Sequence, residues 1–416
     1  MEEQMRTYLR IGRLIDGRGG APIEDAVIRI DGARIGRVGP AAALGEAVDP
    51  DAWVDFAAGT ALPGLVDAHT HFSLSADGRS YEEMALDPDE LMAINGARNA
   101  LRHLRSGVTT ARDNGARNRV VFVLREAIER GYAEGPRLLV SGRPLTCSAG
   151  HFHWCNGVAD GELEIRRAVR RLVAEGADHI KIMASGGGTV GTDPTRASYT
   201  VAELRAAVET AHELGRPTTS HCRALESMRR AMEAGSDCLE HGEFLTPGGE
   251  MSFDEETGKR LVDSGIYLSP TLQASGWDTI LRLREKRETS GLDATETSAL
   301  AATERETEER LAQVGRLLQL GMGPRIVAGT DAGCFDFSFG HMDYALDLLA
   351  KAGMTPMQAI IAGTSVAAAA CGVADEAGIL EAGRPADILI VDGDPLTDIA
   401  AVGRVTAVYQ GGRRVT

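Results

Sequence analysis

The stretch Leu62-Pro63-Gly64-Leu65-Val66-Asp67-Ala68-His69-Thr70-His71-Phe72 decides how the rest of the chain is interpreted. Its apolar residues predict a short buried strand, and Pro63-Gly64 marks a break at its start. His69 and His71 come at the end of this strand, and because strand side chains alternate, both imidazoles point to the same side. Two neutral imidazoles that converge at a strand end predict a site for a divalent metal ion. Two histidines in a polar loop are the alternative, so the prediction depends on matching ligands elsewhere.

The length and composition fit an α/β protein with one large and one smaller domain. The chain has 416 residues, of which 49 are Gly, and 5% are aromatic, which is typical of many tight strand–helix connections. The 44 Lys and Arg against 60 Asp and Glu give a net charge of −16. A nucleic-acid-binding protein normally carries a basic patch, and none is visible, so we expect no nucleic-acid partner.

The sequence also predicts a cytoplasmic protein without a membrane span. No apolar run reaches the roughly 18 residues that a span needs. Met1–Gln4 shows no basic region followed by an apolar run, so we expect no signal peptide. The six cysteines are scattered without CxxC spacing, and reduced thiols are the default in the cytoplasm.

Both ends of the chain show the pattern of small β structure. In the first part, Asp31-Gly32 predicts a hairpin turn between two strands with alternating apolar residues. The C-terminal part contains two further apolar strand runs. Neither end is long enough for a core of its own. We therefore expect residues 1–58 and 376–416 to pair into one small β-sandwich domain, with residues 59–375 inserted as a larger domain.

The middle of the chain alternates short apolar strands with amphipathic helices. Parallel strands that are covered by helices are continuously apolar, and eight such strands indicate an α/β fold with a (β/α)8 TIM-type barrel. The predicted strands are Leu62–Ala68, Val108–Arg112, Arg137–Ser141, His179–Ala184, Pro217–Ser220, Cys238–Glu240, Ile266–Ser269 and Ile326–Gly329. Three of the predicted helices are Leu163–Glu175, Val201–Leu214 and Leu225–Ala234.

A charge-rich helical segment, residues 278–319, interrupts this alternation. We interpret it as a helical excursion after the seventh strand, which serves as a solvated flap or an oligomer contact and takes no part in the chemistry. His103 and His212 lie in other helical patterns, and we expect surface or packing roles for them.

Metal-binding residue types occur at five of the predicted strand ends. Catalytic groups in a barrel of this kind lie at the C-terminal ends of the strands, so residues at these positions converge. A lone histidine at a strand end is more often a structural residue, whereas several candidates in one register predict a metal site. The candidates are His69, His71, Lys181, His221, His241 and Asp331.

Lys181 distinguishes between kinds of metal site. Its neighbours Ile180 and Ile182 face the helices by alternation, so Lys181 faces the barrel interior. Burial lowers the pKa of a lysine toward the neutral amine, and a neutral amine can capture carbon dioxide as a carbamate. Such a carbamate is an anionic ligand with two oxygens, able to bridge two metal ions. The alternative is a lysine that forms a salt bridge with a nearby carboxylate.

On these motifs the sequence resembles the amidohydrolase superfamily, in its binuclear branch with a carboxylated lysine. Within that branch it is similar to the imidazolonepropionase-like group of Xaa-Arg and Xaa-Pro dipeptidases and ochratoxin-type amidases. The matching segments are Leu62–Phe72, His179–Gly188, Gly329–Gly333 and Gly378–Pro395. The resemblance implies a homo-oligomer that acts on a small-molecule amide or dipeptide.

The resemblance also implies how two divalent metal ions share the ligands, with zinc as the default and manganese, iron or cobalt as alternatives. One ion would be held by His69, His71 and Asp331. The other would be held by His221 and His241, with the carbamate on Lys181 as the bridge. Imidazolonepropionases and the related deaminases are generally mononuclear and lack this lysine, so Lys181 argues against those activities.

Such a centre predicts hydrolysis of a carbonyl–nitrogen bond. The two ions share a hydroxide whose pKa they have lowered, and one ion polarises the substrate carbonyl. Asp331 accepts the proton and delivers it to the leaving nitrogen. We expect a metal-dependent hydrolase of dipeptides or N-acyl amino acids. The alternatives are a hydrolase of a non-peptide amide, carbamate or urea of the aryl amide or xenobiotic type, a cyclic amidase or deaminase, and a non-catalytic barrel scaffold.

The loop after the third predicted strand, Cys147–Gly157, offers two histidines for the substrate. His151 or His153 would donate a hydrogen bond to the carbonyl oxygen or to a substrate carboxylate, and we favour His153 as the catalytic donor. A loop histidine that is merely exposed to water is the alternative.

Arg223 comes two residues after the predicted ligand His221, so its side chain should point the same way. Relatives often carry an aromatic residue there. A guanidinium suits bidentate binding of a carboxylate, which favours a substrate with a free carboxylate. An ion pair with Glu243 or another acid is the alternative. After the eighth strand, His341 is a weaker candidate for substrate binding, in a segment rich in phenylalanine that would line an apolar pocket.

Overall fold

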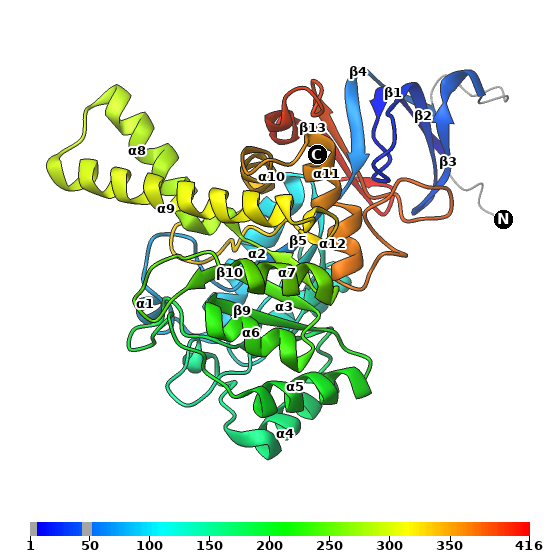
Figure 1. Ribbon diagram of the computed structural model, residues 1–416. Helices are drawn as coiled ribbons and strands as arrows, with labels where there is room; N and C mark the ends of the chain where they lie inside the picture. Colours follow the sequence, from blue (N-terminus) through cyan, green and yellow to red (C-terminus); the bar gives the residue numbers. More distant parts are fainter. Residues whose placement is uncertain (1–5, 44–51) are drawn as a thin grey trace.

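The computed structural model describes residues 6–43 and 52–416. The protein is an α/β protein in which a mixed sheet lies beside a larger body of parallel strands and helices (Figure 1). None of the described helices is long and apolar enough to cross a membrane. Met1–Gln4, on which the expectation of no signal peptide rests, lies outside the described residues.

The mixed sheet joins the two ends of the chain. Around Thr60, β4 pairs in parallel with β1 and antiparallel with β12, so one strand connects the N-terminal and C-terminal segments. β2 and β3 form the predicted hairpin, and Gly32 takes a left-handed conformation at its turn (φ 61°). In sheet order the strands are β14 (Arg413–Arg414), β13 (Val405–Gln410), β12 (Ile388–Asp392), β4 (Trp53–Pro63), β1 (Arg6–Leu14), β2 (Ile23–Asp31) and β3 (Arg34–Pro40).

The passage from β4 into the larger body lies at Gly64. The predicted division after residue 58 falls inside β4, because this strand continues to Pro63 while it pairs with β12. Gly64 makes the break before β5 (Leu65–Thr70), and a Cβ at this position would lie 2.1 Å from Thr109 Oγ1. Leu62 therefore belongs to the mixed sheet, and the first parallel strand begins three residues later than Leu62.

The larger body contains the predicted parallel strands in two groups. Isolated parallel bridges link the groups on both sides: Leu145 pairs with Ile182, Leu268 with Ile326, and Thr70 with Ala332. One group is β5, β6 (Val108–Asp113) and β7 (Arg137–Val140); the other is β8 (Ile180–Met183), β9 (Thr218–Ala224), β10 (Cys238–Leu245) and β11 (Tyr267–Ser269).

The predicted eighth strand, Ile326–Gly329, forms one isolated bridge, between Ile326 and Leu268, and no regular ladder. It still lies between β11 and β5. The Val327 N–H donates to the Leu268 carbonyl at 2.9 Å, and the Ala68 N–H donates to the Ala328 carbonyl at 3.1 Å. These contacts bring the first and the last of the predicted parallel strands together.

Helices lie between the parallel strands, and three of them match the predicted helices: α4 (Gly161–Ala174), α5 (Val201–Glu213) and α6 (Leu225–Ala234). α5 begins with a capping box of Thr200 and Glu203. The other helices of the body are α1 (Tyr81–Met84), α2 (Asp89–Arg105), α3 (Val120–Glu129), α7 (Glu255–Ser264), α10 (Met342–Lys351), α11 (Pro356–Ala362) and α12 (Ser365–Ala370). Short 3₁₀ helices are η1 (Ala41–Ala43), η3 (His153–Cys155), η4 (Leu272–Ser275), η5 (Gly323–Arg325) and η6 (Ile399–Gly403).

The charge-rich segment 278–319 is helical, as predicted, and projects from the body as two helices, α8 (Trp277–Thr289) and α9 (Ala294–Gln319) (Figure 1). The base of this arm is fastened to the chain segment after the eighth predicted strand. Thr279 Oγ1 donates to Asp336 Oδ2 at 2.5 Å, and Ser338 donates to Asp278 through its backbone N–H and its hydroxyl.

Candidate active site

All six predicted metal ligands line one cavity at the C-terminal ends of the parallel strands. Each of them is at least 93% buried, so the site is shielded from bulk water. The lining residues are His69, His71, Tyr81, His151, Phe152, Lys181, Met183, Gly188, His221, Arg223, His241, Glu243, Ala274, Asp331, Cys334, Phe335 and Phe337.

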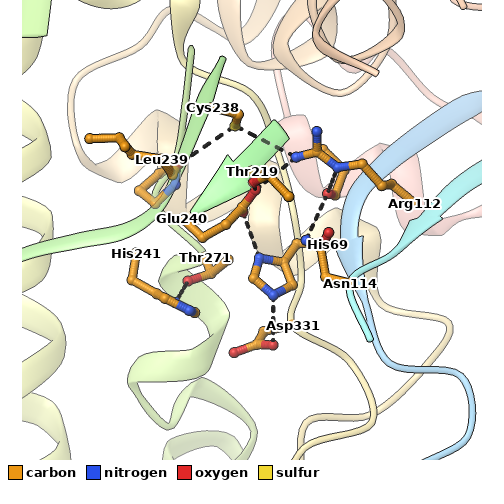
Figure 2. A network of polar contacts seen from close by, with 12 residues as sticks. His69, Arg112, Asn114, Thr219, Cys238, Leu239, Glu240, His241, Thr271 and Asp331 are labelled. Carbon is orange, nitrogen blue, oxygen red and sulfur yellow. Dashed lines mark hydrogen bonds and ion pairs between the residues drawn. The ribbon is translucent and has the colours of Figure 1, made fainter. Parts of the chain in front are cut away.

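His69, near the end of β5, is held by a buried carboxylate that the sequence reasoning missed. Its Nδ1 lies 2.6 Å from Glu240 Oε2, while its Nε2 points at Asp331 Oδ1, 3.3 Å away (Figure 2). The same Nε2 lies 3.5 Å from Lys181 Nζ. A carboxylate on one imidazole nitrogen fixes the tautomer and presents the lone pair of the other nitrogen. His69 therefore presents the lone pair of its Nε2 to the cavity.

Glu240 is itself fixed by two donors, Arg112 and Thr219 (Figure 2). Arg112 Nη2 donates to Glu240 Oε1 at 2.8 Å, and Thr219 Oγ1 donates to the same oxygen. Burial raises the pKa of this carboxyl, but His69 and Arg112 more than offset the effect and hold the pKa well below its usual range. Glu240 is therefore a carboxylate in the folded protein, although it is fully buried.

The backbone at His241 explains how two neighbours in β10, Glu240 and His241, both point inward. Strict alternation would place them on opposite faces. His241 takes φ 67°, and the ladder to β9 shifts register just after it. Asp331 has the same left-handed backbone, with φ 61°. Non-glycine residues in this region are uncommon and cluster at functional sites.

His71 and Asp331 complete one side of the cavity. The His71 Nδ1–H donates to the Gly115 carbonyl at 3.0 Å, so its Nε2 is the free nitrogen, 3.3 Å from Asp331 Oδ1. Burial raises the pKa of Asp331, but the imidazoles of His69 and His71 outweigh it, and the pKa ends below its ordinary value. Asp331 is therefore a carboxylate between two imidazole nitrogens.

His221 and His241 face each other across the cavity, with ring centroids 4.4 Å apart. The His221 Nε2–H donates to the Gly186 carbonyl at 3.1 Å, which leaves Nδ1 as its free nitrogen. His241 Nδ1 lies 2.7 Å from Thr271 Oγ1. Its Nε2 is buried without a hydrogen-bond partner in the part of the chain that the structure describes. A buried imidazole nitrogen without a partner is costly unless a ligand such as a metal ion satisfies it.

Lys181, in β8, is 1% exposed and stands among these ligands. Burial lowers the pKa of its ammonium group. Within residues 6–43 and 52–416, no carboxylate forms an ion pair with Lys181, so the salt-bridge alternative has no support here.

The donor set therefore fits divalent metal ions. Ligand atoms of His69, His241 and Asp331 lie within 4.8 Å of one another, and so do those of His71, Asp331 and Cys334. Imidazole nitrogens and a carboxylate oxygen are ligands that zinc and related ions prefer.

Asp67 ties the strand of His69 to the segment of Asp331, which the sequence did not reveal. Its Oδ1 accepts from the backbone N–H groups of His69 and Thr330, and its Oδ2 accepts from Thr330 Oγ1 at 2.7 Å. The same Oδ2 lies 3.0 Å from His103 Nε2. His103, expected in a surface or packing role, thus supports Asp67 from α2.

The structure separates the predicted substrate residues into two groups. His151 lines the cavity with Nδ1 2.8 Å from Thr189 Oγ1, and burial together with His71 lowers its pKa to about 3. His153 is exposed and lies outside the lining, because Phe152 takes φ 58° and turns the chain, so that Phe152 packs inward while His153 begins η3. His341 also lies outside the lining, stacked on Tyr344 at 4.5 Å.

Arg223 lines the cavity and forms the ion pair that was the stated alternative: its Nε lies 2.6 Å from Glu243 Oε2. Opposite, Tyr81, Phe152, Phe335 and Phe337 form an aromatic wall. Gly188 allows this wall to close, since a Cβ there would lie 2.8 Å from Phe335 and 2.9 Å from Tyr81.

Comparison with known proteins gives matches along the whole chain. Residues 60–415 match the Amidohydrolase family. Ochratoxinase from Aspergillus niger is 28% identical over 445 residues, covering 99% of this chain and 87% of that protein. Imidazolonepropionase from Micrococcus luteus is 25% identical over 411 residues, covering 95% of each. A solved Xaa-Pro dipeptidase with methionine bound in its active site has a TM-score of 0.83 at 28% identity, covering 98% of this chain and 99% of that one.

Proposed function

This chain belongs to the amidohydrolase family and is a hydrolytic enzyme, and from that premise we propose that it hydrolyses the amide bond of dipeptides or N-acyl amino acids. The names of two relatives, ochratoxinase and an Xaa-Pro dipeptidase, support this class of substrate. We assign two divalent metal ions, zinc by default, to His69, His71, Lys181, His221, His241 and Asp331.

One observation carries the proposal: Lys181 is buried among the candidate ligands without a carboxylate partner in the described residues. A lysine whose pKa is lowered by burial is available as the neutral amine, which reacts with carbon dioxide to form a carbamate. The Nζ lies 3.5 Å from His69 Nε2, so a carbamate on Lys181 would place its oxygens among the ligands of both ions. A one-metal deaminase has no need of this lysine.

Asp331 is the group that moves the proton. Divalent ions, when bound, supply Lewis acidity and lower the pKa of water. Asp331 is held as a carboxylate with Oδ1 3.3 Å from both His69 Nε2 and His71 Nε2. It accepts the proton from the attacking water and delivers it to the leaving nitrogen. The Asp67–Thr330 contacts keep it at the position where both events occur.

Arg223 and His151 bind the substrate in this proposal. Glu243 engages Arg223 at Nε, and within the described residues no group bonds to the two terminal amino groups of its guanidinium. These amino groups match the two oxygens of a substrate carboxylate. His151 takes the role first given to His153: with its pKa lowered to about 3 it is neutral at physiological pH and donates an N–H to the substrate carbonyl oxygen.

A second candidate function follows from the aromatic wall. Tyr81, Phe152, Phe335 and Phe337 offer an apolar surface beside the metal ligands, which suits the aryl group of a non-peptide amide, carbamate or urea. This candidate differs from the first in its independence from Arg223, because an aryl amide needs no carboxylate partner.

The finer features of the fold belong to the same proposal. The bridges between the two groups of parallel strands support a closed (β/α)8 barrel, inserted between residues 1–58 and 376–416 of a small β-sandwich domain. All six cysteines are free thiols, which supports a reducing, cytoplasmic location. We also propose that the protein forms a homo-oligomer in which the α8–α9 arm contacts a neighbouring subunit.

A substrate panel tests the proposal. The protein, reconstituted with zinc in bicarbonate buffer, is assayed on dipeptides and N-acyl amino acids, on the same compounds with the terminal carboxylate converted to an amide, and on anilides, carbamates and phenylureas. We expect cleavage of the free-carboxylate compounds and little cleavage of their amidated counterparts. Cleavage of anilides or phenylureas alone would favour the second candidate, and a fully metallated protein that cleaves no compound would contradict both.

A further inference from the structure

Cys334 lines the active-site cavity but is not one of the six residues to which the two metal ions are assigned. It follows Asp331 by three residues and is 1% exposed. Its Sγ lies 3.7 Å from Asp331 Oδ1. Ligand atoms of Cys334, His71 and Asp331 all lie within 4.8 Å of one another. The thiol is therefore a member of a three-residue cluster of metal-binding groups.

Two of the three distances in this cluster match those around a tetrahedral metal ion. With metal–nitrogen and metal–oxygen bonds of about 2.0–2.1 Å and a metal–sulfur bond of about 2.3 Å, tetrahedral angles place nitrogen and oxygen about 3.4 Å apart and oxygen and sulfur about 3.6 Å apart. The observed separations are 3.3 Å for His71 Nε2 to Asp331 Oδ1, and 3.7 Å for Asp331 Oδ1 to Cys334 Sγ. One ion would reach all three atoms with small movements.

The backbone of the segment 331–334 holds this arrangement. Asp331 has φ 61° and Gly333 has φ 111°, so the chain folds back over His71 directly after the eighth predicted strand. A Cβ at Gly333 would lie 2.2 Å from the His71 carbonyl oxygen, so only glycine permits the approach. The turn that brings Asp331 to His71 thus also brings the Cys334 thiol to Asp331.

We propose that Cys334 is a further ligand of the metal ion that His71 and Asp331 hold, a role that rests on the proposed metal centre. On binding, the thiol gives its proton to solvent and the thiolate forms the bond to the ion. A nitrogen, oxygen and sulfur ligand set selects zinc or cobalt over manganese, because thiolates prefer softer ions. The sulfur therefore determines which metal this protein keeps, independently of the substrate that it cleaves.

Cobalt reports the bond directly. The whole chain is loaded with Co²⁺, and its absorption is recorded in the near ultraviolet, where a thiolate-to-cobalt charge-transfer band appears, and in the visible range, where cobalt absorbs whatever its ligands are. The same spectra are recorded for Cys334→Ser and for the control Cys222→Ser. Cys222 is equally buried and adjacent to His221 but does not line the cavity. Circular dichroism confirms that each variant is folded.

We expect the charge-transfer band in the wild type and in Cys222→Ser, and its loss in Cys334→Ser with the visible bands retained. In competition, the preference for zinc over manganese should fall in Cys334→Ser alone. Visible bands without a charge-transfer band in the wild type would overturn the role of Cys334 and leave the metal centre standing, whatever the variants do. A band that persists in Cys334→Ser would overturn it too. A wild type that binds no cobalt would overturn the metal centre together with the role of Cys334.

Discussion

Replacing Glu240 with Gln tests whether a buried carboxylate prepares His69 as a ligand. The amide has the same shape, but it carries one acceptor and one donor where Glu240 presents two acceptors. If its oxygen faces Arg112 and Thr219, its NH₂ meets His69 Nδ1, which then becomes the acceptor and moves the ring proton to Nε2. That proton would point at Lys181 and Asp331, in the place of the metal ion. If the amide is flipped, its NH₂ faces the guanidinium of Arg112, and two hydrogen-bond donors then point at each other.

The size of the effect follows from these contacts. The loss of an orienting carboxylate behind a metal-binding histidine typically weakens metal binding about 10-fold to 100-fold, which corresponds to about 1.4–2.8 kcal/mol. Arg112 is 2% exposed and would lose its only carboxylate partner among the described residues. A broken buried ion pair costs about 3–5 kcal/mol of stability. Glu240→Gln should therefore bind metal more weakly and unfold more readily.

The assay measures the zinc dissociation constant by chelator competition and the free energy of unfolding of the metal-free protein in urea. Glu134→Gln is the matched control: it makes the same chemical change at an exposed carboxylate, 2.9 Å from Arg413. We expect the control to stay within about 0.5 kcal/mol of the wild type. If the folded Glu240→Gln variant binds zinc as tightly as the wild type does, Glu240 does not set the tautomer of His69.

The remaining predictions concern three side chains of the cavity and the response to acid. Lys181→Ala should leave about one zinc ion per chain in place of about two, with turnover lower by orders of magnitude; full metal content and activity would contradict the bridge. Asp331→Asn, compared at equal metal occupancy, should lower kcat roughly 10²–10⁴-fold. Arg223→Met should raise KM for free-carboxylate substrates about 10-fold or more and leave KM for their amidated counterparts unchanged. The pKa of Glu240 is lowered in the folded state. Its contribution to stability is therefore present above the unfolded pKa of about 4.3 and is lost as the pH falls below that value. When the free energy of unfolding is measured at decreasing pH, Glu240→Gln should lose less of it than the wild type.

Strand alternation was sufficient to predict which side chains of the regular strands face the cavity. His69 points inward from β5 and Lys181 from β8, as a period of two requires, and the positions of α4, α5 and α6 followed from their apolar spacing. These elements repeat a local pattern, so the sequence carries enough information for them. The mixed sheet at the termini was likewise visible in its strand patterns and hairpin turn.

The sequence did not reveal residues whose orientation depends on one backbone angle or whose role depends on a partner far along the chain. Glu240 stands next to His241, and alternation turns it away; only the left-handed backbone at His241 brings both inward. Alternation would place His151 and His153 on the same side, but Phe152 between them is left-handed, and of the two only His151 lines the cavity, so the preference for His153 was wrong. Asp67 lies in the opening motif, but its role depends on Thr330, far along the chain.

The bond between Asp67 and Thr330 has a consequence for the order of events during synthesis. The two residues are 263 positions apart, so the chain that leaves the ribosome carries His69 and His71 long before Asp331, which is part of the same proposed metal centre. Contacts of such sequence separation form late and slow the final step of folding. Metal capture should therefore mark the end of folding: a nascent chain that stops before Thr330 has no complete site, and the mature affinity for the ion appears only when the last segment has docked beside the first parallel strand.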